Sequence, residues 1–210
     1  MATCPELHSN TVCLKPFVEQ HHLSDHYVSW LNDQATMAFS EQRHQVHTRY
    51  SCRQFHQSFA SSPHQLWAIE AVSSGEHIGN LTVSHDKNNR LADIGILIGA
   101  QSARGCGYGK TAWNLVLRYL KLNDDIYKVT GGCMRQNLPM VRIMESCGMT
   151  LDCIRENHFL ANDIPVDIVY YSIRGNWQPE TIDGDETMSA VKGRLARRPT
   201  ERGNSVLPKL

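Results

Sequence analysis

The region between residues 91 and 120 constrains the fold most, because three different patterns follow one another in it. Residues 91–99 (LADIGILIG) form a short, β-branched apolar run, which predicts a buried strand. Further on, apolar residues at i, i+3, i+4 and i+7 predict a helix with one buried face: Trp113, Val116, Leu117 and Leu120. Between the two lie Gly105, Gly107 and Gly109, which allow the backbone to approach a ligand at the positive end of the helix. The sequence therefore predicts a loop that binds a phosphorylated cofactor.

Three nucleotide-binding patterns compete for this loop, and Arg104 and Lys110 separate them. A Walker A loop requires glycine where this chain has Arg104, and a dinucleotide fingerprint requires glycine where it has Lys110. The pattern Arg/Gln-x-x-Gly-x-Gly/Ala fits as Arg104, Gly107 and Gly109. It resembles the pyrophosphate loop of the GCN5-related N-acetyltransferases (GNAT), which bind acetyl-coenzyme A. For the loop taken alone, the alternative is a glycine-rich turn without a ligand.

The residues after this helix predict three strands, at residues 127–130, 149–159 and 165–173. The first is expected to close at Gly131 and Gly132, and the last two are expected to meet in a turn at Asn162 and Asp163. These signals give an α/β pattern in which strands outnumber helices near the end of the chain.

A second helix is expected to begin at Asn137 and to stop at Gly148. The run NLPMVRIMESCGM at residues 137–149, followed by Arg155 and Val166-Asp167, closely resembles the RimJ/RimL-type branch of the GNAT superfamily. The resemblance covers about residues 10–173. It implies an α/β (α+β) GNAT fold, with a single mixed, mostly antiparallel central sheet of about seven strands flanked by about four helices.

The front half predicts the remaining elements in the order that this fold requires. Strands are expected at residues 11–18, 66–72 and 77–83. Ser24 and Thr48 are expected to cap two helices, because their side-chain oxygens suit the N-cap position. We expect a GNAT domain over residues 10–175 and a polar, flexible tail over residues 176–210. A short peripheral helix or a functional basic arm is the alternative for the tail.

Composition excludes several classes of partner. With 21 acidic and 21 basic residues, the chain is expected to bind neither nucleic acid nor a membrane surface. No apolar stretch approaches the ~20 residues of a membrane span, and the first residues lack a secretory signal. Seven scattered cysteines without a Cys-x-x-Cys pair favour reduced thiols and a cytoplasmic location. The spacing of the eleven histidines matches no zinc motif, so no metal is expected.

The resemblance implies that acetyl-CoA is the co-substrate and that the acetyl group passes directly to an amine. Backbone groups of Ile96, Leu97 and Ile98 are expected to align the pantetheine arm and to stabilise the thioester oxyanion. The loop is expected to hold the pyrophosphate through these residues: Arg104, Gly105, Cys106, Gly107, Tyr108, Gly109 and Lys110. Asn137 matches a position that contacts the cofactor in the family, and Arg142 faces either the cofactor or solvent.

Two carboxylates are candidates for the general base, because an alkyl ammonium with a pKa near ~10.4 is protonated at neutral pH. Asp93 is the first candidate, since relatives often carry a glutamate at this point, and Glu70 is the second. For either, the alternative is an ordinary exposed strand carboxylate. The tyrosine that many superfamily members use to protonate the leaving thiolate corresponds to Met144. Tyr170, Tyr171 or water then takes that role.

The acceptor is expected to meet residues 37–48, which the resemblance places beside the acceptor pocket. Arg43 is a candidate for pairing with a phosphate or carboxylate, Glu41 for holding an amine or sugar hydroxyls, and His47 for adding to a diphosphate site. A solvated loop is the alternative. We expect a small-molecule amine or an amino sugar as acceptor. The alternatives are a protein N-terminus, a non-catalytic acyl-CoA-binding regulator and a P-loop phosphotransferase; a homodimer is compatible with the resemblance.

Overall fold

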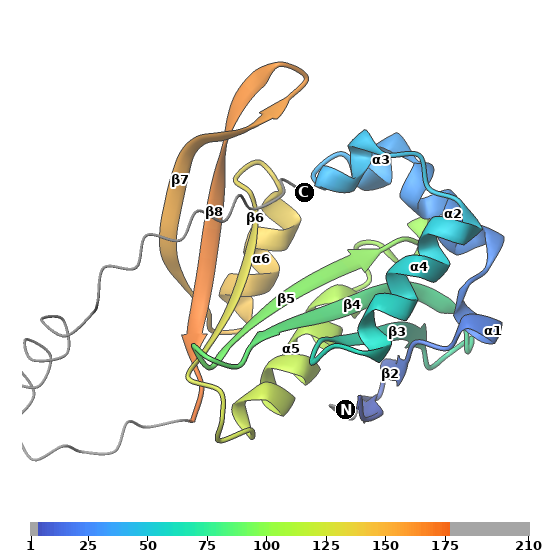
Figure 1. Ribbon diagram of the computed structural model, residues 1–210, viewed down its shortest axis with the longest axis horizontal. Helices are drawn as coiled ribbons and strands as arrows, with labels where there is room; N and C mark the ends of the chain where they lie inside the picture. The colour runs from blue at the N-terminus through green and yellow to red at the C-terminus, as the bar shows by residue number, and fades with distance from the viewer. Residues whose placement is uncertain (1–3, 177–210) are drawn as a thin grey trace, which may run out of the picture. The chain divides into compact units, whose positions relative to one another are not determined.

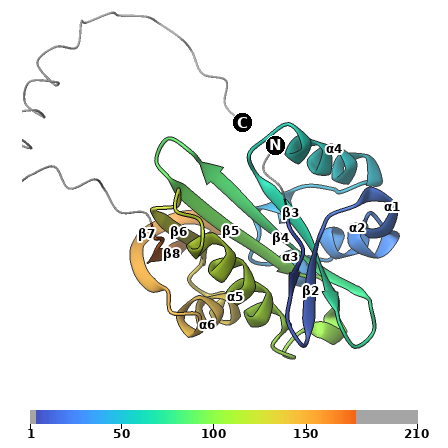
Figure 2. The ribbon, with the colours of Figure 1, turned by 90° about the horizontal axis from the view of Figure 1, so that it is seen from below.

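The central sheet buries apolar side chains on both faces, as the alternation along β3 (Gln65–Ala71) illustrates. In the computed structural model, which describes residues 4–176, Trp67 and Ile69 belong to one hydrophobic cluster, and Leu66 and Ala68 belong to another. Successive side chains of a strand point to opposite faces. The two clusters therefore mark a sheet that lies between two layers of helices (Figures 1 and 2).

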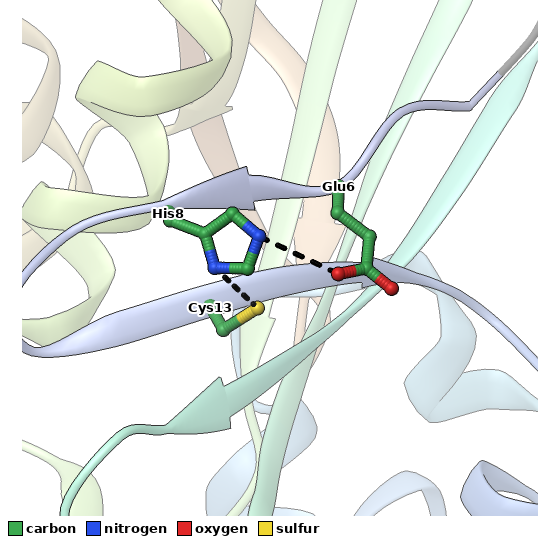
Figure 3. Close-up of side chains that lie close together, drawn as sticks. All are labelled: Glu6, His8 and Cys13. Carbon is green, nitrogen blue, oxygen red and sulfur yellow. Dashed lines mark hydrogen bonds and ion pairs between the residues drawn. The ribbon is translucent and has the colours of Figure 1, made fainter.

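Eight strands form this sheet in the order β1-β2-β3-β4-β5-β6-β8-β7. Besides β3 they are β1 (Leu7–His8), β2 (Val12–Pro16), β4 (His77–Asp86), β5 (Leu91–Ile98), β6 (Lys128–Met134), β7 (Thr150–Ala161) and β8 (Ile164–Arg174). Only β5 and β6 are parallel among the paired strands of residues 4–176. The expected mixed, mostly antiparallel sheet is confirmed. The sequence pattern did not predict β1, which pairs with β2 at one edge of the sheet (Figure 3).

Helices cover both faces of the sheet. They are α1 (Glu19–His22), α2 (Asp25–Asn32), α3 (Gln34–Met37), α4 (Arg49–Ala60), α5 (Tyr108–Lys121) and α6 (Leu138–Ser146), with short 3-10 helices η1 (Glu41–His44) and η2 (Gln101–Ala103). α5 and α6 pack against one face, and α2 and α4 pack against the other. The four residues of α5 expected to be buried are at most 2% exposed. No helix within residues 4–176 has the length and hydropathy needed to cross a membrane.

Local sequence signals predicted the ends of several elements correctly. The side-chain oxygens of Ser24, Thr48 and Asn137 accept backbone N–H hydrogen bonds at the starts of α2, α4 and α6. Asn162 and Asp163 have φ values of 51° and 62° and form the two-residue turn between β7 and β8. Asparagine and aspartate tolerate this left-handed conformation better than most residues do.

Gly131 and Gly132 lie within β6, so the prediction that they close the strand is wrong. Glycine is needed there because aromatic rings cover both faces of the strand. A Cβ atom on Gly131 would lie 2.7 Å from the Trp113 ring, and one on Gly132 would lie 2.8 Å from the Tyr170 ring. Tyr170 belongs to β8, and its ring therefore packs on Gly132 of the neighbouring strand β6.

Candidate active site

β5 and β6 separate in the middle of the sheet and leave part of β5 without a neighbouring strand on the β6 side, while β4 pairs with the other side throughout. Their parallel register ends at Asp93 opposite Thr130, whereas β5 continues to Ile98. Figure 1 shows the two strands running apart. Ile96 and Leu97 also lie on the diverging stretch. Backbone groups on the β6 side of this stretch are therefore able to pair with an extended ligand as with an added strand.

The glycine loop after β5 presents unpaired backbone N–H groups. Gly105 and Gly107 have φ values of 75° and 82°, a left-handed conformation that suits glycine. Within residues 4–176, no acceptor is bonded to the N–H groups of residues 105–110. Free N–H groups in a nest at the positive end of a helix bind anions. The loop therefore has the geometry of an anion-binding site. That Gly105, Cys106, Gly107, Tyr108, Gly109 and Lys110 hold the cofactor pyrophosphate stays a prediction.

Arg104 differs from the rest of the loop, because both its backbone and its side chain are bonded to the protein. Its N–H donates to the Gln101 carbonyl at 3.1 Å. Its guanidinium donates to Thr36 Oγ1 at 2.7 Å and to the Ile98 carbonyl at 3.2 Å. Thr36 also contacts the Asp33 carboxylate. In this arrangement Arg104 links the loop to α3.

The remaining candidates for cofactor binding lie on α5 and α6. Lys110 is exposed in the first turn of α5, and Arg142 is exposed on α6. A side chain on Gly109 would lie 3.2 Å from Ile143, so α6 flanks the start of α5. Asn137 caps α6, and its Oδ1 accepts an N–H of the first turn at 3.3 Å. Lys110 and Arg142 therefore remain available to an anionic ligand, whereas the Asn137 oxygen is already engaged.

Asp93 lines a hollow of about 190 Å³ at the point where β5 and β6 separate. The aromatic residues that line the same hollow are Phe39, Phe159 and Tyr170. Asp93 Oδ2 accepts a hydrogen bond from Thr130 Oγ1 at 2.6 Å. Although the residue is open to solvent, the surrounding protein desolvates its carboxylate and raises the pKa, and the Thr130 hydrogen bond partly opposes this shift. A raised pKa moves a carboxylate towards the range in which a general base works best.

The candidate proton donors differ in their access to this hollow. Met144 is fully buried and carries no proton to give. Tyr171 is buried, and its hydroxyl donates to Glu145 Oε1 on α6 at 2.9 Å. Tyr170 lines the hollow itself. Of the two tyrosines named from the sequence, Tyr170 is therefore the one that the fold places beside Asp93.

The two thiols near the site lack the surroundings of a nucleophile. Cys133 lines the hollow, but burial raises the pKa of its thiol to about 11. Cys106 is exposed in the loop, where its thiol donates to the carbonyl oxygens of Ser102 and Arg104. Because the thiolate is the reactive form, Cys133 is suited to packing rather than to attack on a thioester.

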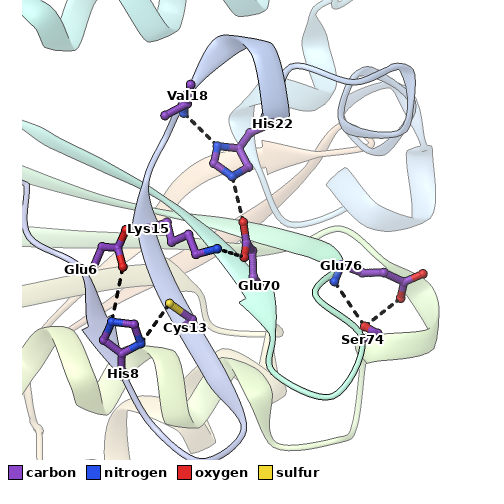
Figure 4. Close-up of polar contacts among 9 residues, drawn as sticks. All are labelled: Glu6, His8, Cys13, Lys15, Val18, His22, Glu70, Ser74 and Glu76. Carbon is purple, nitrogen blue, oxygen red and sulfur yellow. Dashed lines mark hydrogen bonds and ion pairs between the residues drawn. The ribbon is translucent and has the colours of Figure 1, made fainter.

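Glu70 belongs to a different polar network, on β3, with β4 between it and Asp93. Its carboxylate accepts from Lys15 Nζ at 2.7 Å and from His22 Nε2 at 3.1 Å (Figure 4). The Val18 N–H donates to His22 Nδ1 at 2.8 Å, which assigns the ring proton to Nε2. Burial favours a higher pKa for Glu70, but its hydrogen bonds outweigh this effect and hold the pKa below its usual value. The structure does not bring the two candidate bases together.

The buried His22 and the half-buried His77, both beside Glu70, predict that acid destabilises the protein. Burial lowers the pKa of His22 and of His77, although hydrogen bonds to Glu70 and Asn80 oppose the shift. Each histidine then binds more protons when unfolded, so its contribution to stability is present above ~6.5 and is lost as pH falls towards the folded pKa. Urea unfolding should therefore show a lower midpoint at pH ~5.5 than at pH ~7.5. A midpoint that stays constant or rises on acidification would contradict this assignment.

The segment at residues 37–48 reaches across to the tip of the β7–β8 hairpin. Arg43 Nη1 contacts Glu41 Oε1 at 2.7 Å, and Nη2 donates to the Leu160 carbonyl at 2.8 Å. The Arg43 side chain is only 15% exposed. His47 Nε2 lies 3.1 Å from the Gln42 carbonyl. The residues expected to bind the acceptor thus bond to each other or to the backbone, and Arg43 links this segment to the hairpin.

Several residues in or beside the hollow were not indicated by the sequence. Thr130 lies opposite Asp93 because of the short parallel register between β5 and β6. The strand order implied by a GNAT fold would have been enough to find it. Phe39 and Phe159 line the same hollow although they are far apart in the sequence, and no pattern within either segment signals this.

Comparison with known proteins agrees with this geometry. A family model described as an acetyltransferase (GNAT) domain matches residues 11–150. RimL, a ribosomal L7/L12 alpha-N-protein acetyltransferase solved with coenzyme A, has a TM-score of 0.71 and 17% identity, over 83% of this chain and 100% of its own. Spermidine N-acetyltransferase from Vibrio cholerae, solved with CoA and spermine, has a TM-score of 0.68 and 17% identity, over 79% of this chain and 96% of its own.

A GNAT-family acetyltransferase from Bacillus anthracis is similar to the same degree, with a TM-score of 0.67 and 16% identity over 81% of this chain and 98% of its own. The search of curated proteins finds no match. The structural similarities, at these identities, support the fold, and the family model covers more than half of the chain. The chain therefore belongs to the GNAT family and is an acetyl-CoA-dependent N-acetyltransferase.

Proposed function

We propose that the protein transfers an acetyl group from acetyl-CoA directly to the primary amine of a small molecule or an amino sugar. The position of Asp93 carries this proposal. Its carboxylate lines the hollow at the point where β5 loses β6 as a neighbour. An amine held in the hollow would meet a thioester aligned along Ile96, Leu97 and Ile98, with Asp93 within reach of its proton.

The backbone of the chain supplies the groups that bind and polarise the donor. The free N–H groups of residues 105–110 suit phosphate oxygens, and the diverging part of β5 suits the amides of an extended arm. A β5 N–H directed at the thioester carbonyl would stabilise the oxyanion formed on attack, a contribution of ~2.7–4 kcal/mol in other enzymes. Acetyl-CoA brings the activated acetyl group, so the acceptor amine is the only nucleophile required.

Asp93 is the general base in this proposal. Roughly one alkyl amine in a thousand is neutral at pH ~7, because the pKa of its ammonium is near ~10.4. The carboxylate takes a proton from the ammonium, and the nitrogen lone pair that is freed then attacks the thioester carbon; the raised pKa of Asp93 favours this transfer. Thr130 holds Oδ2 at 2.6 Å. The hydrogen bond therefore orients the carboxylate and leaves Oδ1 directed to other partners.

Tyr170 is the proposed donor of a proton to the departing thiolate. It lines the same hollow as Asp93, whereas the Tyr171 hydroxyl is bonded to Glu145. A thiol with a pKa near ~8.5 leaves with little assistance. We therefore expect Tyr170→Phe to reduce the rate less than a change at Asp93.

The surroundings of Asp93 support a compact cationic amine as the acceptor. Asp93 offers the charge opposite to that of an ammonium group, and the rings of Phe39 and Phe159 line the same hollow. The Tyr170 ring is already covered by Gly132 and by the Arg155 guanidinium, which lies 4.9 Å from its centroid. The donors of Arg43 are already bonded to Glu41 and to backbone carbonyls. Arg43 is therefore less suited to binding the diphosphate of an amino-sugar nucleotide. An amino sugar that carries no nucleotide stays among the proposed acceptors.

A panel of acceptors tests the proposal. Thiol release from acetyl-CoA should be measured with polyamines, small monoamines, amino sugars, amino-sugar nucleotides and short peptides with free N-termini. We expect turnover with a small amine or an amino sugar. Turnover with peptides alone would support a protein N-terminal acetyltransferase, the activity that the printed name of RimL carries. CoA binding without turnover on any acceptor would support the non-catalytic regulator.

Replacing Arg43 by alanine is expected to raise KM for the acceptor about fivefold without changing the affinity for CoA. The side chain joins the segment that carries Phe39 to the hairpin that carries Phe159. Loss of one partly exposed charged hydrogen bond costs about 1 kcal/mol, which corresponds to about fivefold. Arg49→Ala is the matched control, since Arg49 bonds Asp25 and the Leu23 carbonyl at the start of α4. An equal effect in both variants would show that Arg43 has no special part in the hollow.

A cytoplasmic location is part of the proposal. All seven cysteines of the chain are free thiols in the structure. Free thiols in this number are typical of proteins that work in a reducing compartment.

A further inference from the structure

Three side chains of metal-binding type converge at the edge of the sheet, on the hairpin formed by β1 and β2. His8 is paired directly with Cys13 across the two strands. Glu6 lies two residues before His8, so the alternation of side chains directs all three to one face. Figure 3 shows the His8 imidazole between the Glu6 carboxylate and the Cys13 thiol. Cys13 Sγ lies 3.3 Å from His8 Nδ1, and Glu6 Oε2 lies 3.4 Å from His8 Nε2.

We propose that Glu6, His8 and Cys13 bind a zinc ion, with water as the fourth ligand. One donor atom from each residue lies within 4.8 Å of the other two. Tetrahedral zinc, with Zn–S ~2.3 Å and Zn–N ~2.0–2.1 Å, places sulfur and nitrogen roughly 3.6 Å apart. The separation of Cys13 Sγ and His8 Nδ1 is already 3.3 Å. Glu6 contacts the other ring nitrogen, Nε2, so an ion bound through Nδ1 requires the Glu6 carboxylate to move round the ring. The side chains of His8 and Glu6 are 64% and 53% exposed, which leaves room for this movement.

The donor set selects the class of metal. A thiolate and an imidazole favour a borderline ion such as zinc, whereas magnesium and calcium require oxygen ligands throughout. The Cys13 thiolate and the Glu6 carboxylate together carry two negative charges, which match a divalent cation. The nearby ammonium of Lys15 is paired with Glu70 at 2.7 Å (Figure 4), so its charge is balanced there.

Binding at this site is expected to release a proton. A thiol must lose its proton before its sulfur binds zinc. The metal must therefore displace the thiol proton, and its affinity falls as pH falls. The consequence for the protein is structural, because β1 has only two residues and lies at the sheet edge. A zinc ion would join the start of the chain to β2, far from Asp93 on β5.

Cobalt substitution tests the site on the full chain. Co²⁺ added to the protein in the presence of a non-thiol reductant should give one equivalent of thiolate-to-cobalt charge-transfer absorption in the near ultraviolet. Zn²⁺ should displace the cobalt and raise Tm. We expect Cys13→Ser to abolish the absorption, and His8→Asn and Glu6→Gln each to weaken binding at least tenfold. Cys153→Ser, which removes an exposed thiol on β7, is the matched control and should behave as the wild type.

Two results would overturn the proposal. Absence of the absorption in the wild-type chain would exclude a thiolate-bound metal. Its persistence in His8→Asn at unchanged affinity would place the metal elsewhere; since the His8 side chain is 64% exposed, this variant is expected to fold normally. A test by Cys13→Ser alone would be weaker, because Cys13 is only 7% exposed and its loss also affects packing.

Discussion

Replacing Asp93 by asparagine is expected to lower kcat about 10²–10⁴-fold, the usual contribution of a general base. Asparagine preserves the shape of the side chain and accepts the Thr130 hydrogen bond, but it does not take a proton from the amine. The affinity for CoA should be unchanged, because the free N–H groups of the loop are not altered. Steady-state thiol release and CoA titration on the same preparation measure the two quantities separately. The loss should shrink at higher pH, as more of the acceptor becomes neutral without help.

Glu70→Gln is the matched control for Asp93→Asn. Glu70 is bonded to Lys15 and His22, so the change should cost about 1.5–3 kcal/mol of unfolding free energy and leave kcat almost unaltered. Urea unfolding and thiol release distinguish these effects. If Glu70→Gln removed activity while remaining stable, or if Asp93→Asn retained it at neutral pH, the assignment of the base would be wrong.

Replacing Gly107 by glutamate is expected to weaken CoA binding ~10- to 100-fold, equivalent to one lost charge-assisted hydrogen bond of ~1.5–3 kcal/mol. A Cβ atom at Gly107 meets open space, so the loss does not come from a clash with the protein. It comes from a carboxylate placed among the N–H groups that suit phosphate, and from the φ of 82° that L-residues avoid. CoA titration by calorimetry gives the affinity.

Gly75→Ala controls for the backbone effect at Gly107. Gly75 lies in the β3–β4 connection with a φ of 70° and, like Gly107, has no atom near the position of a Cβ. Gly107→Ala and Gly75→Ala should therefore lose similar stability, about 1 kcal/mol. Only changes at Gly107 should affect CoA affinity. Unchanged affinity in Gly107→Glu would remove the loop from the cofactor site.

The parts of the fold that depend on neighbouring residues could be predicted from the sequence. The buried face of α5 follows from the spacing of its apolar residues, and the N-caps at Ser24 and Thr48 follow from side-chain oxygens at helix starts. The glycine loop with its free N–H groups follows from the spacing of its glycines ahead of a helix. The tail expected at residues 176–210 lies, apart from its first residue, outside the described residues.

The parts that depend on distant segments could not be predicted. The sequence predicts a strand end at Gly131 and Gly132, because no neighbouring residue indicates that the rings of Trp113 and Tyr170 pack against them. The sequence predicts that Arg43 is free to bind the acceptor, because its partner, the Leu160 carbonyl, lies on a hairpin 117 residues away.

The cluster of Glu6, His8 and Cys13 shows the same limitation. Their spacing matches no zinc motif, which is why the sequence predicts no metal. Only the register of β1 with β2 brings their donor atoms together.

The central claim is that this chain moves an acetyl group from acetyl-CoA to an amine bound beside Asp93. The most direct measurement follows free CoA thiol and acetylated amine together, for the acceptor that the panel selects, with wild type and Asp93→Asn in parallel. We expect one acetylated amine for each thiol released by the wild type, and slow formation of both by the variant. Thiol release without acetylated amine, or equal rates for the two proteins, would contradict it.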